Sequence, residues 1–114
     1  MLDARHYIVR IDDRGVPLAG ARTYVWRFEA AELVGLGSSW ALTTDPPAGR
    51  LTNDAPLVVA ADGALLFWPW PAEPHDPDKR ANWLRTPPGL FSLNLDVTAP
   101  EEAWLPPPVA VIEP

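Results

Sequence analysis

The sequence contains no cysteine, which excludes a disulfide framework and a thiolate metal site. Basic residues are also few: Lys and Arg total 9 against 15 Asp and Glu, and the formal net charge is −6. An acidic chain gains no affinity from counterion release on nucleic acid and is repelled by anionic membrane surfaces. No run of 18 apolar residues is present, and residues 1–6 lack the basic and apolar regions of a signal peptide. We therefore expect neither a nucleic-acid partner nor a membrane partner.

The side chains needed for nucleophilic catalysis are scarce as well. The serines are Ser38, Ser39 and Ser92, the histidines are His6 and His75, and no nucleophile elbow surrounds any of these serines. The cluster at residues 75–78 is the best arrangement of oxygen ligands for a metal, but it lacks the spacing of a calcium loop. We interpret it as a solvated acidic loop. The sequence thus predicts a protein that is not an enzyme and that uses no cofactor and no metal.

Proline and tryptophan, in contrast, are abundant, with 15 and 6 residues. Proline removes a backbone donor and interrupts helices, so the chain should form short strands and rigid loops. The predicted fold is all-β, a small antiparallel β-sandwich or barrel with long proline-rich loops. An open sheet completed by a partner chain is the alternative. We assign residues 1–98 to the β-sandwich module and residues 99–114 to a proline-rich C-terminal arm.

Alternation of apolar and polar residues gives the individual strands. The clearest pattern, at residues 90–97, predicts that Phe91, Leu93, Leu95 and Val97 point inward. Further strands are expected at residues 6–12, 21–28, 38–44, 56–60 and 64–68. Asp62-Gly63 predicts a hairpin turn between the last two. Helical turns are expected within residues 29–36 and 78–84. The prolines of residues 69–88 should exclude a central strand there.

Tryptophans beside prolines are the candidate functional residues. Tryptophan is a frequent hot spot of protein interfaces, and an indole can equally stack on a sugar or fill the end of a small core. All three interpretations remain open at this point. The polyproline triplet near the C-terminus favours an exposed arm lying across a neighbouring subunit. The predicted interface residues are Trp68, Trp70, Trp83, Trp104, Pro106, Pro107 and Pro108.

Several turn-and-strand motifs occur in a fixed order along the chain. They are Asp13-Arg14-Gly15-Val16-Pro17, Gly20-Ala21-Arg22-Thr23-Tyr24, Leu51-Thr52-Asn53-Asp54-Ala55-Pro56, Ala61-Asp62-Gly63, Phe67-Trp68 and Gly89-Leu90-Phe91-Ser92-Leu93. In this order they resemble a small β-sandwich module of bacteriophage tail and tail-fibre proteins. The first two motifs are also similar to transthyretin-like and carboxypeptidase-regulatory-like sandwiches. The segment at residues 69–88 is longer than the phage module usually has there.

The resemblance implies a non-catalytic virion structural protein of a bacteriophage, a tail, tail-fibre or adaptor component that acts through subunit–subunit contacts. Its partners would be other virion structural proteins and copies of itself, as a trimer or hexamer. Its location would be the virion, assembled in the host cytoplasm. The alternatives are a carbohydrate-binding or adhesion module, which would make a glycan a partner, and a capsid decoration protein.

Overall fold

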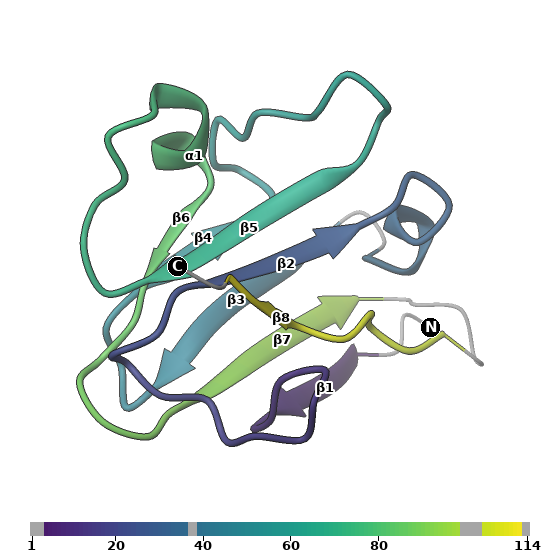
Figure 1. Cartoon of the computed structure of the whole chain (residues 1–114). Helices are drawn as coiled ribbons and strands as arrows, with labels where there is room; N and C mark the ends of the chain where they lie inside the picture. The colour runs from purple at the N-terminus through teal and green to yellow at the C-terminus, as the bar shows by residue number, and fades with distance from the viewer. Residues whose placement is uncertain (1–3, 37–38, 99–103, 113–114) are drawn as a thin grey trace.

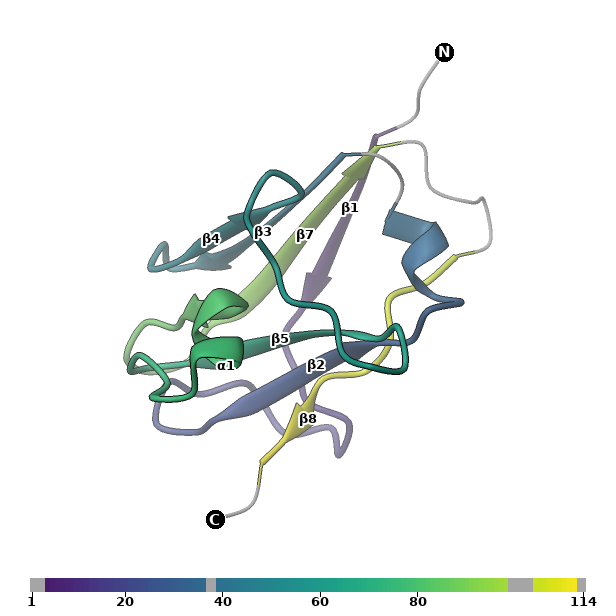
Figure 2. The same cartoon turned by 90° about the horizontal axis from the view of Figure 1, so that it is seen from above.

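Two four-stranded sheets pack as two layers in the computed structural model, which describes residues 4–36, 39–98 and 104–112 (Figures 1 and 2). The strand orders are β1-β7-β3-β4 and β6-β5-β2-β8. The strands are β1 (Ala4–Val9), β2 (Tyr24–Phe28), β3 (Trp40–Asp45), β4 (Arg50–Thr52), β5 (Leu65–Trp70), β6 (Trp83–Arg85), β7 (Ser92–Thr98) and β8 (Ala110–Val111). Two short helices, η1 (Leu33–Leu36) and α1 (Pro77–Ala81), complete the fold. The predicted all-β sandwich is confirmed, and among the described strand pairs only β5 and β6 run parallel.

The strand β7 supplies the centre of the first sheet and confirms the clearest sequence pattern. Phe91, Leu93, Leu95 and Val97 are all buried, while the residues between them face outward. Their inward side chains meet Trp26, Phe28 and Phe67 from the opposite sheet in one apolar cluster. Burial of this cluster is the main favourable contribution to folding of a chain this size.

The first strand is shorter than its alternation predicts. Tyr7 and Val9 pack against the core, but Ile11 is 51% exposed. The reason is local, because the chain turns around Asp12 and Ile11 pairs only with Pro17. An apolar side chain is therefore displayed at one end of the sandwich.

Residues 56–60 do not form the strand that their apolar character predicts. The turn at Asp62-Gly63 is present, with Gly63 at a φ of +87°, but a single bridge joins Val59 to Leu65. Val58 pairs with a side chain instead, since its N–H and its carbonyl both bond the Asn82 amide at 2.8 and 2.7 Å. A residue remote in sequence thus replaces the expected partner strand.

Pro69 lies in β5, an interior strand of the second sheet, although the prolines of residues 69–88 were expected to exclude a central strand there. Its neighbours Trp68 and Trp70 make the hydrogen bonds to the β6 side, so the ring nitrogen of Pro69 faces β2. The β2–β5 register, continued by two residues, puts Tyr24 opposite Pro69. The carbonyl of Tyr24 accepts a hydrogen bond from the Trp70 indole at 3.0 Å. The indole thus supplies the donor that proline lacks.

The C-terminal segment packs on its own chain. Figure 2 shows residues 104–109 and η1 beside each other where the two layers diverge. Val109 is fully buried, and residues 110–111 add β8 to the edge of β2. The described part of the predicted arm therefore completes the sandwich, because its apolar side chains are needed to close this side of the core.

A buried carboxylate organises the first turn. Asp12 is 4% exposed, and its Oδ1 accepts the N–H groups of Arg14 and Val16 at 2.8 and 3.1 Å. Burial by itself raises the pKa of Asp12, but these two N–H groups and the Arg14 guanidinium outweigh burial and hold the pKa below its usual 3.8. The turn is consequently stabilised by the ionised form of the Asp12 carboxyl group.

We expect Trp70→Phe to lower the free energy of unfolding by about 1 to 3 kcal/mol, because the Tyr24 carbonyl is left without a donor. Pro69→Ala restores a backbone N–H facing that carbonyl. The loss on Trp70→Phe should therefore be smaller in the Pro69→Ala background, as measured by urea unfolding of all four chains. Equal losses in both backgrounds would contradict this account.

The lowered pKa of Asp12 predicts an acid-sensitive fold. The stabilisation is present above about pH 4, where the carboxyl is ionised in both states, and it is lost as the pH falls through the lowered pKa of the folded state. Urea unfolding between pH 7 and pH 2.5 should show a smaller decline for Asp12→Asn than for the wild type. Identical pH dependence of the two proteins would rule out this role.

Candidate functional site

Three of the predicted interface residues come together on the outer face of the second sheet. Trp68 and Trp70 alternate with the buried Phe67 and Pro69 along β5, so both indoles point away from the core. Trp83 on β6 is paired in register with Trp68. The parallel β5–β6 pair thus places three tryptophans side by side that the sequence separates by up to 15 positions.

Helix α1 packs over this aromatic face. The helix begins after Asp76, whose side chain accepts the N–H of Asp78 at 2.9 Å, and Pro77 occupies its first turn. Its Lys79 places Nζ 4.8 Å from the ring centroid of Trp68 and 5.4 Å from that of Trp70. These are cation–π distances, so the ammonium group holds both rings in place.

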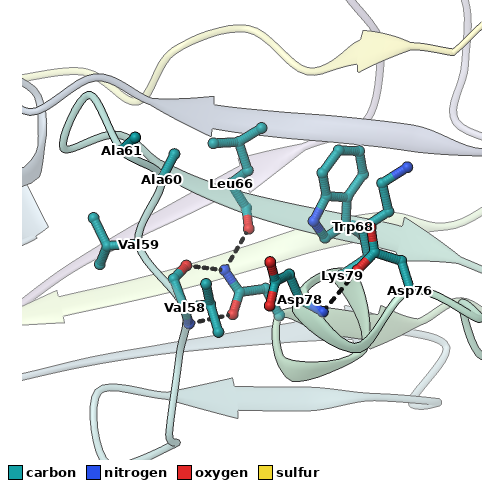
Figure 3. Close-up of a pocket in the computed structure, with 10 residues that line it drawn as sticks. Val58, Val59, Ala60, Ala61, Leu66, Trp68, Asp76, Asp78 and Lys79 are labelled. Carbon is teal, nitrogen blue, oxygen red and sulfur yellow. Dashed lines mark hydrogen bonds between the residues drawn. The ribbon is translucent and has the colours of Figure 1, made fainter.

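A pocket of about 270 Å³ lies between α1, β5 and the loop before β5 (Figure 3). One wall is apolar, and the other carries the charged side chains of the helix. Figure 3 shows the Trp68 indole standing between Leu66 and the end of the Lys79 side chain. The lining residues are Val58, Val59, Ala60, Ala61, Leu66, Trp68, Asp76, Asp78, Lys79 and Asn82.

Asn82 fixes the shape of this pocket. It is 2% exposed, and besides its two bonds to Val58 its Nδ2 donates to the Leu66 carbonyl at 2.8 Å. Its backbone carbonyl accepts the N–H of Trp68 at 3.1 Å. One residue therefore connects the loop, β5 and the C-terminus of α1. Sequence reasoning missed it, and a lone Asn in a proline-rich loop gave no signal.

The remaining predicted residues lie elsewhere. Trp104 donates its indole N–H to the Glu32 carbonyl at 3.0 Å and packs edge-on against Tyr7. Pro107 accepts the indole N–H of Trp26 at 2.7 Å, Pro106 is half-buried and Pro108 is exposed. These contacts are made within the chain, and they do not join the β5–β6 cluster. A role of any of the seven residues in a subunit interface stays a prediction.

A second pocket, of about 400 Å³, lies at the end of the sandwich where Ile11 is displayed. Leu90, 71% exposed, stands on its other side, and Leu18 and Phe91 form its floor. Arg10 and Asp45 carry opposite charges at its edge. The sequence did not indicate this apolar end, because it predicted that residue 11 continues the strand at residues 6–12.

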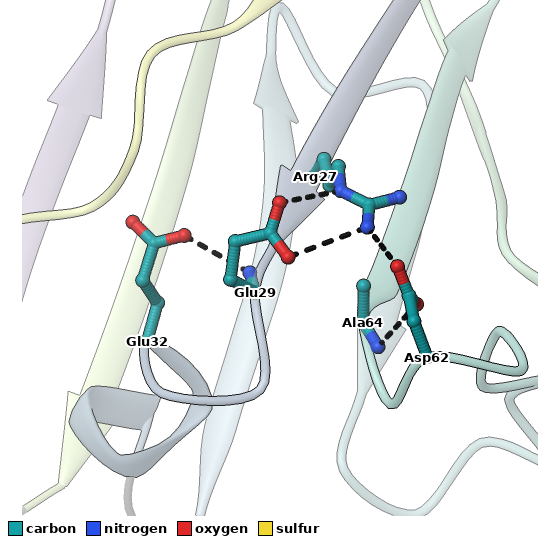
Figure 4. A network of polar contacts seen from close by, with 5 residues as sticks. All are labelled: Arg27, Glu29, Glu32, Asp62 and Ala64. Carbon is teal, nitrogen blue, oxygen red and sulfur yellow. Dashed lines mark hydrogen bonds and ion pairs between the residues drawn. The ribbon is translucent and has the colours of Figure 1, made fainter.

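A charged network joins the end of β2 to the turn before β5 (Figure 4). The Arg27 guanidinium binds Glu29, with Nε to Oε1 at 2.6 Å, and also contacts the Asp62 carboxylate. The hydrogen bonds that Arg27 donates to these two carboxylates raise its pKa above the usual value. The Ala64 N–H and Arg27 lower the pKa of Asp62. The charged groups of this network bond one another at the surface. We therefore assign it a role in stabilising the turn before β5 and not in binding a ligand.

Within residues 4–36, 39–98 and 104–112, no group of three or more His, Cys, Asp or Glu side chains is arranged to hold a metal ion. Over the same residues, no helix has the length and apolar character needed to span a bilayer.

Comparison with known proteins identifies the fold and the family. The crystal structure of the VPA0106 protein from Vibrio parahaemolyticus superposes with a TM-score of 0.78 at 18% sequence identity. The match covers 97% of this chain but 31% of that protein. No curated protein matches the sequence. A family model described as "Protein of unknown function (DUF1214)" matches residues 3–102. With the model matching nearly the whole sandwich, the chain belongs to the DUF1214 family.

Proposed function

We propose that this chain is a non-catalytic assembly module that docks onto neighbouring subunits, beginning with copies of itself, through its apolar end. The observation that carries the proposal is the exposure of Ile11 and Leu90 on the two sides of a pocket with an apolar floor. Large side chains exposed together around a hollow are typical of surfaces that bind other proteins. The opposite charges of Arg10 and Asp45 would orient a partner at the edge of this surface.

The backbone around the apolar end is held firmly, which favours docking. Phe91 donates its N–H to the Leu18 carbonyl at 3.2 Å, and Gly20 donates to the Gly89 carbonyl at 2.8 Å. A further bridge pairs Ala19 with Leu90. In Figure 1 the two loops involved lie at the same end of the molecule. A surface that is already ordered loses little conformational entropy on binding.

The length of the structural neighbour also supports a docking role. This chain spans about a third of the VPA0106 protein, so the same fold occurs there as one part of a longer chain. A module within a longer protein packs against its neighbours through part of its surface. We propose the corresponding use of the apolar end in this chain.

The narrower prediction, a structural component of a bacteriophage particle, rests on the sequence resemblance. The family description assigns no function, so the role in a bacteriophage particle stays a prediction. The genes beside the coding gene provide its test. Neighbouring tail or capsid genes would support it, and a neighbourhood without virion genes would contradict it.

Light scattering across a concentration series tests the assembly role. We expect the wild-type mass to exceed that of the monomer, and we expect Leu90→Ser to shift the protein to the monomer by removing an exposed apolar contact. Leu105→Ser is the matched control, because Leu105 is similarly exposed, at 74%, but lies outside this pocket. A wild type that remains monomeric at every concentration would overturn the proposal, and so would equal loss of assembly in both variants.

A further inference from the structure

We propose that the pocket between α1 and β5 binds a neutral saccharide, with the Trp68 indole as the stacking platform and the side chains of Asp76, Asp78 and Lys79 as partners for sugar hydroxyls. The pocket lies on a different surface from the apolar end. The inference is therefore independent of the assembly role proposed above.

Trp68 provides an aromatic platform in the lining of the pocket. The C–H groups of a pyranose ring carry partial positive charge, and they pack well against the electron-rich face of an indole. Trp68 lines the pocket, while Lys79 lies over the ring of Trp68 and also over that of Trp70. The Trp70 ring packs edge-on at 5.9 Å between centroids. These contacts fix the orientation of Trp68 before any ligand arrives.

Polar groups beside this platform match the hydroxyls of a sugar. A hydroxyl both donates and accepts, so it needs acceptor and donor groups within the same pocket. Asp78 offers a carboxylate for which the described residues provide no bonding partner, and Asp76 uses one oxygen on the N–H of Asp78. Lys79 provides the donors.

Rigidity of the opposite wall completes the site. The amide of Asn82 holds both backbone groups of Val58, and this keeps the loop carrying Val59 and Ala60 close to β5. The loop thus contributes an apolar wall without having to be ordered by the ligand. Such preorganisation reduces the entropic cost of binding a small, flexible molecule.

Size and charge indicate which saccharides fit. The volume of about 270 Å³ is at the lower end for small-ligand sites, so it suits a single sugar unit or the end of a chain. The lining carries two carboxylates against one ammonium group. This excess of negative charge disfavours uronic and sialic acids and selects neutral sugars.

The test is a titration of the full chain, labelled with ¹⁵N at its tryptophans, with glucose, galactose, mannose, N-acetylglucosamine and their disaccharides. We expect saturable shifts of the Trp68 indole N–H resonance for at least one neutral sugar. The dissociation constant should be on the order of 1 mM, as the small contact area of one sugar unit allows. Glucuronate should bind at least tenfold more weakly. No saturable shift at 50 mM of any of these sugars would overturn the proposal.

Variants separate the pocket from the rest of the surface. In the Trp68→Ala variant, the sugars should no longer shift the indole N–H resonances of the other tryptophans. Asp78→Asn should weaken sugar binding at least threefold. Asp78 is exposed and lies outside the core, so its replacement tests the site even if Trp68→Ala unfolds the chain. Asp13→Asn, an exposed carboxylate outside the pocket, should leave the affinity unchanged. Equal weakening by the two Asp→Asn variants would overturn the assignment, as would a response to tetramethylammonium but to no sugar.

Discussion

Every buried backbone carbonyl needs a hydrogen-bond donor, and a chain with 15 prolines has 15 fewer backbone N–H groups to provide one. This fold meets the need with tryptophan. The indoles of Trp26, Trp70, Trp83 and Trp104 each donate to a backbone carbonyl, at 2.7 to 3.0 Å. Trp26 also buries its ring in the core and Trp104 packs against it, while Trp70 and Trp83 lie half-buried on the outer face of the second sheet. At Tyr24 the Trp70 indole thus replaces the N–H that Pro69 lacks, whereas the Trp83 indole adds a second donor to a carbonyl that already accepts the Thr86 N–H.

At the second sheet the side chain of Asn82 also bonds backbone groups, and there the result is a pocket. The Asn82 amide pairs with Val58 as a strand would, and its Nδ2 also donates to the Leu66 carbonyl, so a side chain joins the loop to β5 in place of direct strand pairing at Val58. The space that remains becomes a pocket, with Trp68 on one wall and α1 on the other. A regular hairpin at residues 56–68 would have brought the two strands together and closed it. The site proposed for saccharides therefore depends on an interrupted strand.

The two surfaces with proposed roles differ in chemistry and in place. The apolar end displays Ile11 and Leu90, and its backbone is held by bonds between two loops. The pocket beside α1 combines one indole with charged side chains. A module that assembles through one surface keeps the other free for a ligand.

The amino-acid pattern alone determined the fold class, the inward residues of β7 and the turn at Asp62-Gly63, because alternation and turn chemistry are local properties. It also identified Trp68, Trp70 and Trp83 as residues of interest, although their gathering on one face required the parallel pairing of β5 and β6. Tertiary structure decided the rest. The Trp70 indole reaches the Tyr24 carbonyl opposite Pro69, and the Asn82 amide takes the place of a partner strand at Val58. The C-terminal segment buries Val109 in the core. Each of these outcomes depends on a contact between residues distant in sequence, which no local pattern records.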